Sequence, residues 1–329
     1  MNRLLRSLLA LCGASVVALF AGPALAQTYP ARAVTFVVPF AAGGATDVLA
    51  RQFAERMART FGQGIVVENV AGAGGTVGAA RVAKARADGY TFLIGHMGYM
   101  AAAVGLYAKL PYDPVQDFEA VARFPDTPMV LIADRNAGFA DIRGLIERAK
   151  QNPGKINFAN AGVGSAGHLV AALFASTAGI DVASISYKGN APAIVDIMGG
   201  QVQAMFDQSN TALPHVKAQK VLALAITSRE RLPQFPDVPT LQESGLSGFE
   251  AATWYGIYAP RGTPRAAAER IYAQFTETMQ DKAFTGRLAD EGYQLLDPKI
   301  TTGQALAAHT RAEVERWKKV IAEAKIPVN

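Results

Sequence analysis

Cysteine is almost absent from this sequence of 329 residues, and its scarcity limits the available chemistry. The one cysteine, Cys12, lies in an apolar N-terminal stretch that we expect to be removed on export. A chain without cysteine has no disulfide framework, no thiol nucleophile and no cysteine-based zinc site. We therefore expect a packed hydrophobic core to hold the protein together.

The N-terminal stretch has the features of a signal peptide. Two arginines precede an apolar run over residues 8–21 that is too short to span a bilayer comfortably. Ala24-Leu25-Ala26 gives the small-x-small pattern of a cleavage site. We predict that residues 1–26 are cleaved before Gln27 and that the mature chain of 303 residues is periplasmic.

Charge is also sparse, because only 18% of the residues are charged and they are scattered rather than grouped. Without the signal segment, 30 basic residues stand against 27 acidic ones, a net charge of +3. This pattern predicts no nucleic-acid partner, and no later apolar run reaches membrane-spanning length. The four histidines, His96, His168, His215 and His309, show no metal-binding spacing, so neither a metal nor a cofactor is predicted.

Short β-branched runs alternate with helical patterns along the chain. AVTFVVPF, IVVEN, TFLIG, MVLIA and INFAN each precede a predicted helix, over residues 46–61, 76–86, 98–108, 141–151 and 166–178. This order indicates an α/β fold. In the first helix apolar side chains recur at every fourth position, with Thr46 or Asp47 as the cap and Gly62 as the stop.

Proline clusters suggest a division into two lobes. The clusters near residues 122–129 and 231–250 are candidate crossovers between the lobes. They predict a first lobe from residues 27–125 and 249–329 and a second lobe from residues 126–248. A cleft between the lobes would be the natural place for a ligand.

Three segments pass from a strand through glycines into a helix: VVPFAAGGATD, ENVAGAGGTVGAAR and NFANAGVGSAGHLV. A helix start presents unpaired N–H groups and the positive end of the helix dipole, and small side chains let an anion reach them. Each turn alone also has a purely structural interpretation, as a tight connection. Three together, at the carboxyl ends of strands, predict a shared cleft for a carboxylate or a phosphate.

The third turn raises two enzymatic alternatives. Residues 162–167 match the dinucleotide pattern G-x-G-x-x-G, with Asp181 downstream, which suggests a nicotinamide-dependent oxidoreductase. The export signal and the place of the turn in mid-chain argue against it. Ser165 and His168 suggest a secreted serine hydrolase, but Val163 stands where a nucleophile elbow needs glycine. Receptor and exported enzyme both stay open on the residues alone, with the receptor favoured.

Seven strings occur in order along the chain: YPARAVTFVVPFAAGGATDVLAR, ENVAGAGGTVGAARVAKARADGYTFLIG, LPYDPVQDFEAV, AKQNPGKINFANAGVGSAGHL, ISYKGNAPAIVDIMGGQV, LPQFPDVPTLQESG and WYGIYAPRGTP. Together they resemble the Bug-type, TctC-like solute receptors of tripartite tricarboxylate transporters. The resemblance implies a two-lobed periplasmic-binding-protein fold of the Venus flytrap type, in which each lobe is a mixed sheet flanked by helices. It also implies that the protein is not an enzyme and has no catalytic residues.

The same resemblance implies a set of ligand-binding residues. In the family, main-chain groups and ordered waters of the first glycine turn hold a ligand carboxylate between the lobes. The corresponding turn here is Phe40, Ala41, Ala42, Gly43 and Gly44, with Thr46 and Asp47 bracing the helix start. The resemblance also implies a contribution from the opposing lobe by Gly164 and Ser165, with His168 beneath them. The further cleft candidates are Gly74, His96, Met97, Thr127, Tyr187 and Asp207. Asp207 would attract an ammonium group and repel a second carboxylate. Tyr187 and Asp207 also admit structural roles, as a packed ring and as a cap.

The implied partners are a small carboxylate ligand and the membrane permease of a tripartite tricarboxylate transporter, with a sensor kinase as the alternative to the permease. We expect the protein to act as a monomer. The sequence leaves the ligand open among dicarboxylates, tricarboxylates, amino acids, aromatic acids and amides, because loop shape and waters decide between them.

Overall fold

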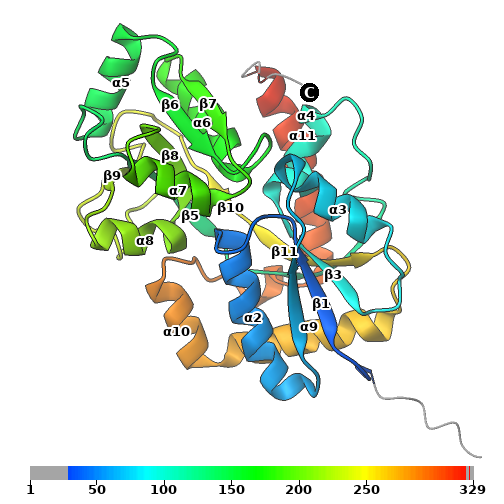
Figure 1. Ribbon diagram of the computed structural model, residues 1–329. Helices are drawn as coiled ribbons and strands as arrows, with labels where there is room; N and C mark the ends of the chain where they lie inside the picture. Colours follow the sequence, from blue (N-terminus) through cyan, green and yellow to red (C-terminus); the bar gives the residue numbers. More distant parts are fainter. Residues whose placement is uncertain (1–28, 324–325, 327–329) are drawn as a thin grey trace, which may run out of the picture.

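The computed structural model describes residues 29–323 and residue 326, so the predicted signal segment and its cleavage site lie outside the described residues. The described chain forms two α/β lobes, each built on one sheet (Figure 1). This is the two-lobed architecture with mixed sheets that the sequence predicts.

The sheet of the first lobe has five strands in the order β2-β1-β3-β11-β4. They are β1 (Val34–Val38), β2 (Ile65–Asn69), β3 (Thr91–His96), β4 (Phe118–Arg123) and β11 (Tyr255–Pro260). β1 pairs in parallel with β2 and β3, whereas β11 runs antiparallel between β3 and β4. The carboxyl ends of β1, β2 and β3 therefore share one edge of the sheet, the edge that faces the second lobe (Figure 1).

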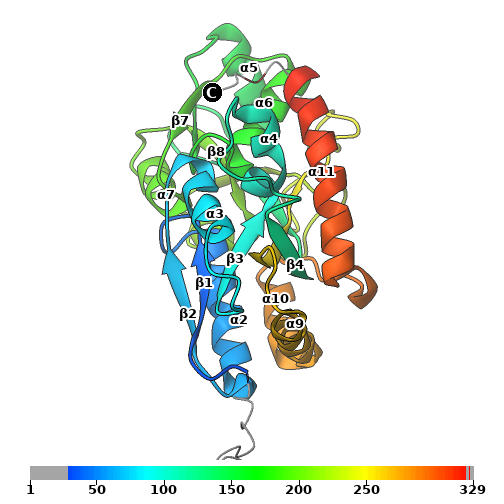
Figure 2. The ribbon, with the colours of Figure 1, turned by 90° about the vertical axis from the view of Figure 1, so that its right-hand side faces the viewer.

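Helices cover both faces of this sheet. One face carries α2 (Ala45–Phe61), α9 (Arg265–Gln280) and α10 (Lys282–Asp290). The other carries the short turns η1 (Ala73–Gly75) and η2 (Gly98–Ala102) and the helices α3 (Thr76–Ala83), α4 (Ala103–Leu106) and α11 (Gly303–Glu323). Figure 2 shows α11, which follows the turn η3 (Pro298–Ile300), running along the side of the first lobe past β4 and α4.

The predicted apolar spacing of α2 appears as a buried stripe, since Leu49, Phe53 and Met57 are fully buried. The helix ends at Gly62, as predicted, in the left-handed conformation that glycine adopts freely. Its start differs from the prediction. Gly44 is the N-cap, and Asp47 lies in the first turn, from which its side chain reaches back to the loop before the helix.

Phe53 anchors α2 in an aromatic cluster. Its ring centroid lies 4.6 Å from Phe124, 5.6 Å from Phe275 on α9 and 5.0 Å from Phe284 on α10. The contacts with Phe124 and Phe284 are edge-to-face, an arrangement that the quadrupoles of the rings favour. The cluster ties α2 to both C-terminal helices and to the segment that leaves the first lobe.

The second lobe is built on β5 (Thr127–Ala133), β6 (Asn157–Asn160), β7 (Ala183–Ser186), β8 (Ala204–Gln208), β9 (Leu222–Ile226) and β10 (Ala252–Thr253). The strand order is β10-β5-β8-β6-β7, and β9 also pairs with β5. β6 runs parallel to β7 and β8, and β5 runs antiparallel to β8. The helices of this lobe are α5 (Ile142–Gln151), α6 (Ala166–Ala178), α7 (Asn190–Met198) and α8 (Ser209–Lys217).

The chain passes between the two sheets at residues 124–126 and at Trp254. The first passage lies within the proline cluster at residues 122–129. The second cluster, residues 231–250, stays with the second lobe, where Leu232 and Phe235 pack into its core. β10 follows this cluster and pairs with β5, so the return to the first sheet comes at Trp254, beyond the boundary that the prolines suggest.

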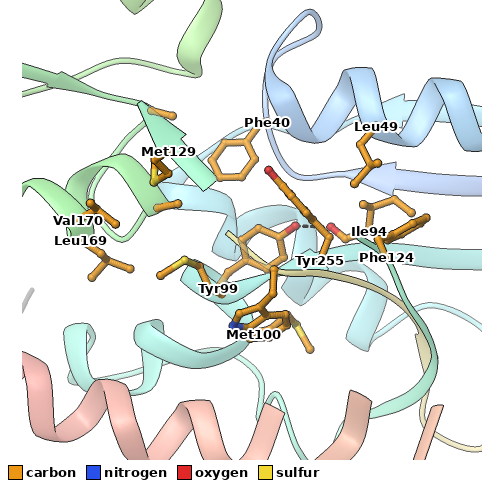
Figure 3. Packing of buried hydrophobic residues seen from close by; sticks show 14 of the residues in the cluster. Phe40, Leu49, Ile94, Tyr99, Met100, Phe124, Met129, Leu169, Val170 and Tyr255 are labelled. Atoms are coloured by element: carbon orange, nitrogen blue, oxygen red, sulfur yellow. Dashed lines mark hydrogen bonds between the residues drawn. The ribbon is translucent and has the colours of Figure 1, made fainter. Parts of the chain in front are cut away.

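Buried apolar side chains of both lobes form one core cluster. Figure 3 shows part of it, with Phe40, Tyr99 and Tyr255 of the first lobe near Met129 of β5. A second cluster, which includes Val130 and Ile194, lies within the second lobe. The continuous first cluster shows that the lobes are packed against each other in this conformation.

Candidate functional site

Three helices begin around one small compartment between the lobes. α2 begins there in the first lobe, and α6 and α7 begin there in the second. This inner compartment has a volume of about 20 Å³, room for roughly one water-sized group. It is lined by Phe40, Gly44, Ala45, Thr46, His96, Ala161, Ser165, Ala166, Gly167, Asn190 and Gln208.

The start of α2 offers main-chain donors to the inner compartment. The first amide that bonds back into the helix is that of Val48, which donates to the Gly44 carbonyl over 2.9 Å. The amides of Ala45 and Thr46 come earlier, where the helix has no carbonyl for them. Because Gly44, Ala45 and Thr46 have no side chain larger than that of threonine, a bound group can approach these amides closely.

The start of α6 is capped by its own side chain. Ser165 is the N-cap, and its hydroxyl accepts a hydrogen bond of 3.4 Å from the His168 amide. The amides of Ala166 and Gly167 again precede the helical ladder. Gly167 must be small, because a Cβ atom there would lie 2.8 Å from the Phe206 carbonyl oxygen, so α6 packs directly on β8.

The start of α7 adds a side-chain amide. Gly189 is the N-cap, and Asn190 follows it at the wall of the inner compartment. The Asn190 side chain donates from Nδ2 to Gln208 Oε1 over 2.7 Å and to the Asp207 carboxylate. Gln208, at the end of β8, donates from Nε2 to Thr253 Oγ1 over 3.4 Å. These bonds hold the polar wall of the second lobe.

His96 is a neutral side chain in this site. It is buried, and burial lowers the pKa of its imidazole to about 3. Its Nδ1 accepts a hydrogen bond of 2.8 Å from the Gly98 amide, so the proton of the neutral ring is on Nε2. Phe40 stacks on the ring with centroids 5.1 Å apart. His96 therefore supplies a polar, uncharged wall.

Asp207 is fully buried and does not line the inner compartment. Burial raises the pKa of its carboxyl to about 6, and hydrogen bonds from Thr211 and Asn190 oppose the rise. Thr211 Oγ1 donates to it over 2.7 Å. The side chain thus holds Asn190 and the start of α8 in place, instead of presenting a charge to a ligand.

No charged side chain is among the residues that line the inner compartment within the described chain. Its electrostatic character therefore comes from three helix N-termini, each carrying roughly half a positive charge. A carboxylate oxygen matches this environment, because it accepts from main-chain amides without a paired cation.

A larger cavity of about 750 Å³ adjoins the inner compartment. We call it the outer cavity, and it is lined by Phe40, Gly72, Ala73, Gly74, Tyr107, Ala161, Gly162, Val163, Ser186, Tyr187, Lys188 and Pro192. Phe40 and Ala161 line both spaces, so the two are neighbours that share part of their walls.

The lobes touch around the outer cavity. The Tyr107 hydroxyl bonds to the Ala73 carbonyl in its own lobe at 3.1 Å and to the Val163 carbonyl across the interface at 3.3 Å. The Ala41 amide donates to the Lys188 carbonyl over 3.3 Å. Gly74 lies so close that a Cβ atom there would be 1.9 Å from the Val163 oxygen. The structure is therefore a closed form.

Parts of the first glycine turn bond within the protein instead of facing the inner compartment. The amide of Gly43 donates to Asp47 Oδ2 over 2.9 Å, and Ala42 is exposed. Asp47 also accepts from Arg51 and Asn69. Burial would raise the pKa of Asp47, but these hydrogen bonds outweigh it and lower the pKa, so the carboxylate stays ionised and braces the turn.

The other predicted residues surround the site without lining the inner compartment. Met97 is packed in the core, and Gly164 donates from its amide to His168 Nδ1 over 3.3 Å. Tyr187 lines the outer cavity and donates from its hydroxyl to Asp196 over 2.7 Å. Thr127 is fully buried at the start of β5.

Sequence reasoning missed several residues of the site: Ala45, Ala161, Ala166, Gly167, Asn190 and Gln208. Tyr255 lies beside one of these residues, Gln208. The Tyr255 hydroxyl is buried and faces Thr46, Thr127 and Gln208, yet it makes no hydrogen bond of ordinary geometry. A partial signal for Asn190 was available, because asparagine is common where helices begin, although Gly189 and not Asn190 is the N-cap of α7.

The geometry does not support the hydrolase alternative. A serine nucleophile needs a histidine nitrogen that accepts its proton. Here the His168 main chain donates to Ser165, and the ring Nδ1 accepts from Gly164 instead. Both side chains are occupied in shaping the start of α6.

Across residues 29–323 no group of three or more histidine, cysteine or acidic side chains is arranged to hold a metal ion. Over the same residues, none of the helices combines the length and the apolar character needed to cross a membrane.

Comparison with known proteins shows the family to which this chain is similar. Residues 49–326 match TctC, the tripartite tricarboxylate transporter family receptor. BugT of Bordetella pertussis is 36% identical over 304 residues, which cover 92% of each chain.

Solved structures of similar proteins have the same fold. The periplasmic binding protein BugD is 39% identical with a TM-score of 0.88, over 92% of this chain and 100% of its own. MatC from Rhodopseudomonas palustris, with bound malate, is 38% identical with a TM-score of 0.86, over 89% of this chain and 100% of its own. R. palustris Rpa4515 with adipate is 34% identical with a TM-score of 0.87, over 92% of this chain and 100% of its own.

The family match spans most of the described chain, and these relatives align over nearly their whole length. Two of the structural relatives hold a dicarboxylate. The chain belongs to the TctC family of tripartite tricarboxylate transporter receptors, which are periplasmic solute-binding proteins and not enzymes.

Proposed function

We propose that this receptor captures a small carboxylate between its lobes and holds one carboxylate group in the inner compartment. The observation that carries the proposal is the meeting of three helix starts in a compartment lined by no charged side chain. Amides of Ala45, Thr46 and Ala166 are the main-chain donors, and Asn190 supports them from α7. The malate and adipate of the relatives support the same ligand class for this chain.

Main-chain donors suffice for useful affinity. A hydrogen bond to a charged group contributes about 1.5–3 kcal/mol, and each helix terminus adds roughly 0.3–1 kcal/mol. Closure keeps these bonds away from water, which strengthens them. Ordering the lobes offsets part of this gain, so micromolar binding is a reasonable expectation.

The experiment compares acids with their neutral amides. Malate, adipate, malamide and adipamide are titrated into the purified protein by calorimetry, after native mass spectrometry has identified any ligand that copurifies. We expect the acids to bind and to raise the unfolding temperature, and the diamides to do neither. Equal binding of acid and amide would contradict the proposal, because helix starts discriminate by charge.

Closing the lobes would present the loaded receptor to a membrane permease of the tripartite tricarboxylate type. We propose that the protein acts there as a periplasmic monomer, after cleavage before Gln27. N-terminal sequencing of the exported protein tests the cleavage site. Crosslinking to the permease in membranes tests the partner, and capture of a sensor kinase in its place would redirect the proposal toward signalling.

A further inference from the structure

Glu313 places a buried carboxylate on α11, and the residue lines neither the inner compartment nor the outer cavity. Burying a carboxylate is costly unless hydrogen bonds replace the water that it loses. Its Oε2 accepts two such bonds, from Trp254 Nε1 over 3.0 Å and from Trp317 Nε1 over 3.2 Å. Its Oε1 pairs with the half-exposed Arg316 at 3.1 Å. Both tryptophans of the sequence therefore donate to one carboxylate oxygen.

The two indole bonds differ in what they join. Trp317 lies four residues after Glu313 on the same helix, so its bond stays within α11. Trp254 is the residue at which the chain returns from the second sheet to the first, so its bond ties a crossover between the lobes to α11. The Trp254 ring also meets His309 of α11 edge-on, with ring centroids 4.9 Å apart.

The other crossover lies beside this one and is held differently. The Phe124 amide donates to the Tyr255 carbonyl over 3.1 Å, so the two passages run side by side. Arg123 forms an ion pair with Asp126 at 2.8 Å. The main chain of Asp126 exchanges two hydrogen bonds with Gln294, of 3.1 Å and 2.8 Å. The first crossover is thus fixed by its own bonds to the first lobe, whereas Trp254 links the second crossover to α11.

The position of Trp254 affects the walls of the inner compartment in both lobes. The preceding residue, Thr253, accepts a hydrogen bond of 3.4 Å at Oγ1 from Gln208 Nε2, and Gln208 lines the compartment from the second lobe. The carbonyl of Trp254 accepts a bond of 3.3 Å from the Met97 amide. Met97 directly follows His96, which lines the compartment from the first lobe. A shift of Trp254 would therefore disturb both walls.

From these contacts we propose that Glu313 is a positioning residue for ligand capture, although it lies outside the site. Its bond to the Trp254 indole fixes the second crossover on α11. The crossover in turn holds Gln208 of one lobe and His96 of the other at the spacing of the closed form. This inference rests on the proposed function only for the choice of ligand.

The first test needs no ligand. Trp254→Phe and Trp317→Phe each remove one indole N–H from the same carboxylate oxygen, and both rings are buried, so the second variant is the matched control. Amide hydrogen exchange at Met97, the donor to the Trp254 carbonyl, is followed by NMR. We expect Trp254→Phe to accelerate this exchange about tenfold and Trp317→Phe to change it less than about twofold. Urea unfolding should show similar losses of stability for the two variants.

The second test measures binding of malate and adipate by calorimetry. Trp254→Phe should weaken binding about tenfold, mainly through faster dissociation in NMR exchange measurements, because the lost bond acts in the closed form. Trp317→Phe should bind within about twofold of the unmodified protein. Glu313→Leu should repeat the loss seen in Trp254→Phe, and Glu313→Gln, which keeps an acceptor oxygen, should recover most of the affinity.

The outcomes separate this inference from the proposed function. Equal exchange at Met97 in the two tryptophan variants would overturn the role of Glu313, whether or not a ligand binds. Equal affinities of these variants for an acid that the unmodified protein binds would overturn it as well. If exchange differs as expected but the unmodified protein binds neither acid, the positioning of the crossover is supported and the proposed function fails.

Discussion

Gly74 controls how closely the two lobes approach, and replacing it with alanine should hold them apart. The added Cβ atom would stand 1.9 Å from the Val163 oxygen in the opposite lobe. Ordinary carbon–oxygen contacts lie above about 3.2 Å. The two segments must therefore separate by about 1.3 Å, and both are main chain, so no flexible side chain can move aside.

The size of the effect follows from the contacts that depend on closure. Such a separation breaks the interlobe bonds from Tyr107 to Val163 and from Ala41 to Lys188. Each has a net value of about 0.5–1.5 kcal/mol, and the main-chain bonds to a ligand carboxylate are loosened as well. We expect Gly74→Ala to weaken carboxylate binding at least tenfold.

The assay is calorimetric titration with malate or adipate, together with small-angle scattering of the liganded protein. The matched control is Gly179→Ala at the end of α6, because both glycines have φ of 62° but a Cβ atom at Gly179 meets nothing within 4 Å. Each substitution costs about 1–2 kcal/mol of stability through the left-handed backbone. Only Gly74→Ala should lose affinity and compactness.

Two results would refute this reasoning. Gly74→Ala could bind with the affinity of the unmodified protein, which would mean that tight contact at Val163 is not needed for capture. Alternatively, Gly179→Ala could lose affinity to the same extent, which would assign the effect to general destabilisation. Neither outcome is compatible with a steric limit on closure at Gly74.

Four further predictions follow from single side chains. Phe53→Ala should lower the free energy of unfolding by about 3–5 kcal/mol in urea titrations, because it empties the cluster with Phe124, Phe275 and Phe284; a loss below 1 kcal/mol would show that the cluster collapses around the gap. The Asp207 carboxyl binds a proton more tightly in the folded protein, where its pKa is about 6, than in the unfolded chain, where it is 3.8. The protonated side chain therefore contributes its full stabilisation below about pH 4, and this stabilisation is lost as the pH rises through 6. Urea unfolding of Asp207→Asn at pH 4 and pH 7 should therefore show the variant gaining relative to the unmodified protein at the higher pH; a difference that does not change with pH would contradict the raised pKa. His96, with a pKa near 3, should show no titration of its ring signals by NMR between pH 8 and 4.5, and a midpoint near 6.5 would place the ring in water. Ser165→Ala should cost about 1 kcal/mol of stability through the lost cap and should weaken carboxylate binding, with no esterase activity before or after; activity that disappears in the variant would reinstate a hydrolase.

The sequence alone was sufficient for the elements whose signal is local. Agreement with the structure is within about two residues for the predicted strands before residue 134 and for the helices at residues 46–61, 141–151 and 166–178. Each of these elements has its own apolar period and its own glycine or proline boundary. The glycine turns before α2 and α6 also gave a correct physical expectation, since both helix starts line the same compartment.

Tertiary structure decided which neighbouring residue has which role. Asp207 and Gln208 are adjacent at the end of β8, but only Gln208 lines the inner compartment, while Asp207 is buried against Asn190 and Thr211. No local sequence pattern distinguishes the role of Asp207 from that of Gln208. The two roles differ because α7 and α8 contribute the residues that surround the Asp207 side chain. The same holds for Tyr255, whose neighbours Thr46 and Thr127 come from distant parts of the chain.

The α/β order and the small residues at helix starts could be read from the sequence, because each is a property of short continuous segments. The family could be read from it as well, because its strings follow one another in order along the chain. The place where three helix starts meet, the tight approach of Gly74 to Val163 and the size of the outer cavity were settled only in the folded molecule. These features depend on packing between segments that lie far apart in the sequence, some by more than a hundred residues. A contact between two such segments leaves no periodic pattern in the sequence of either segment.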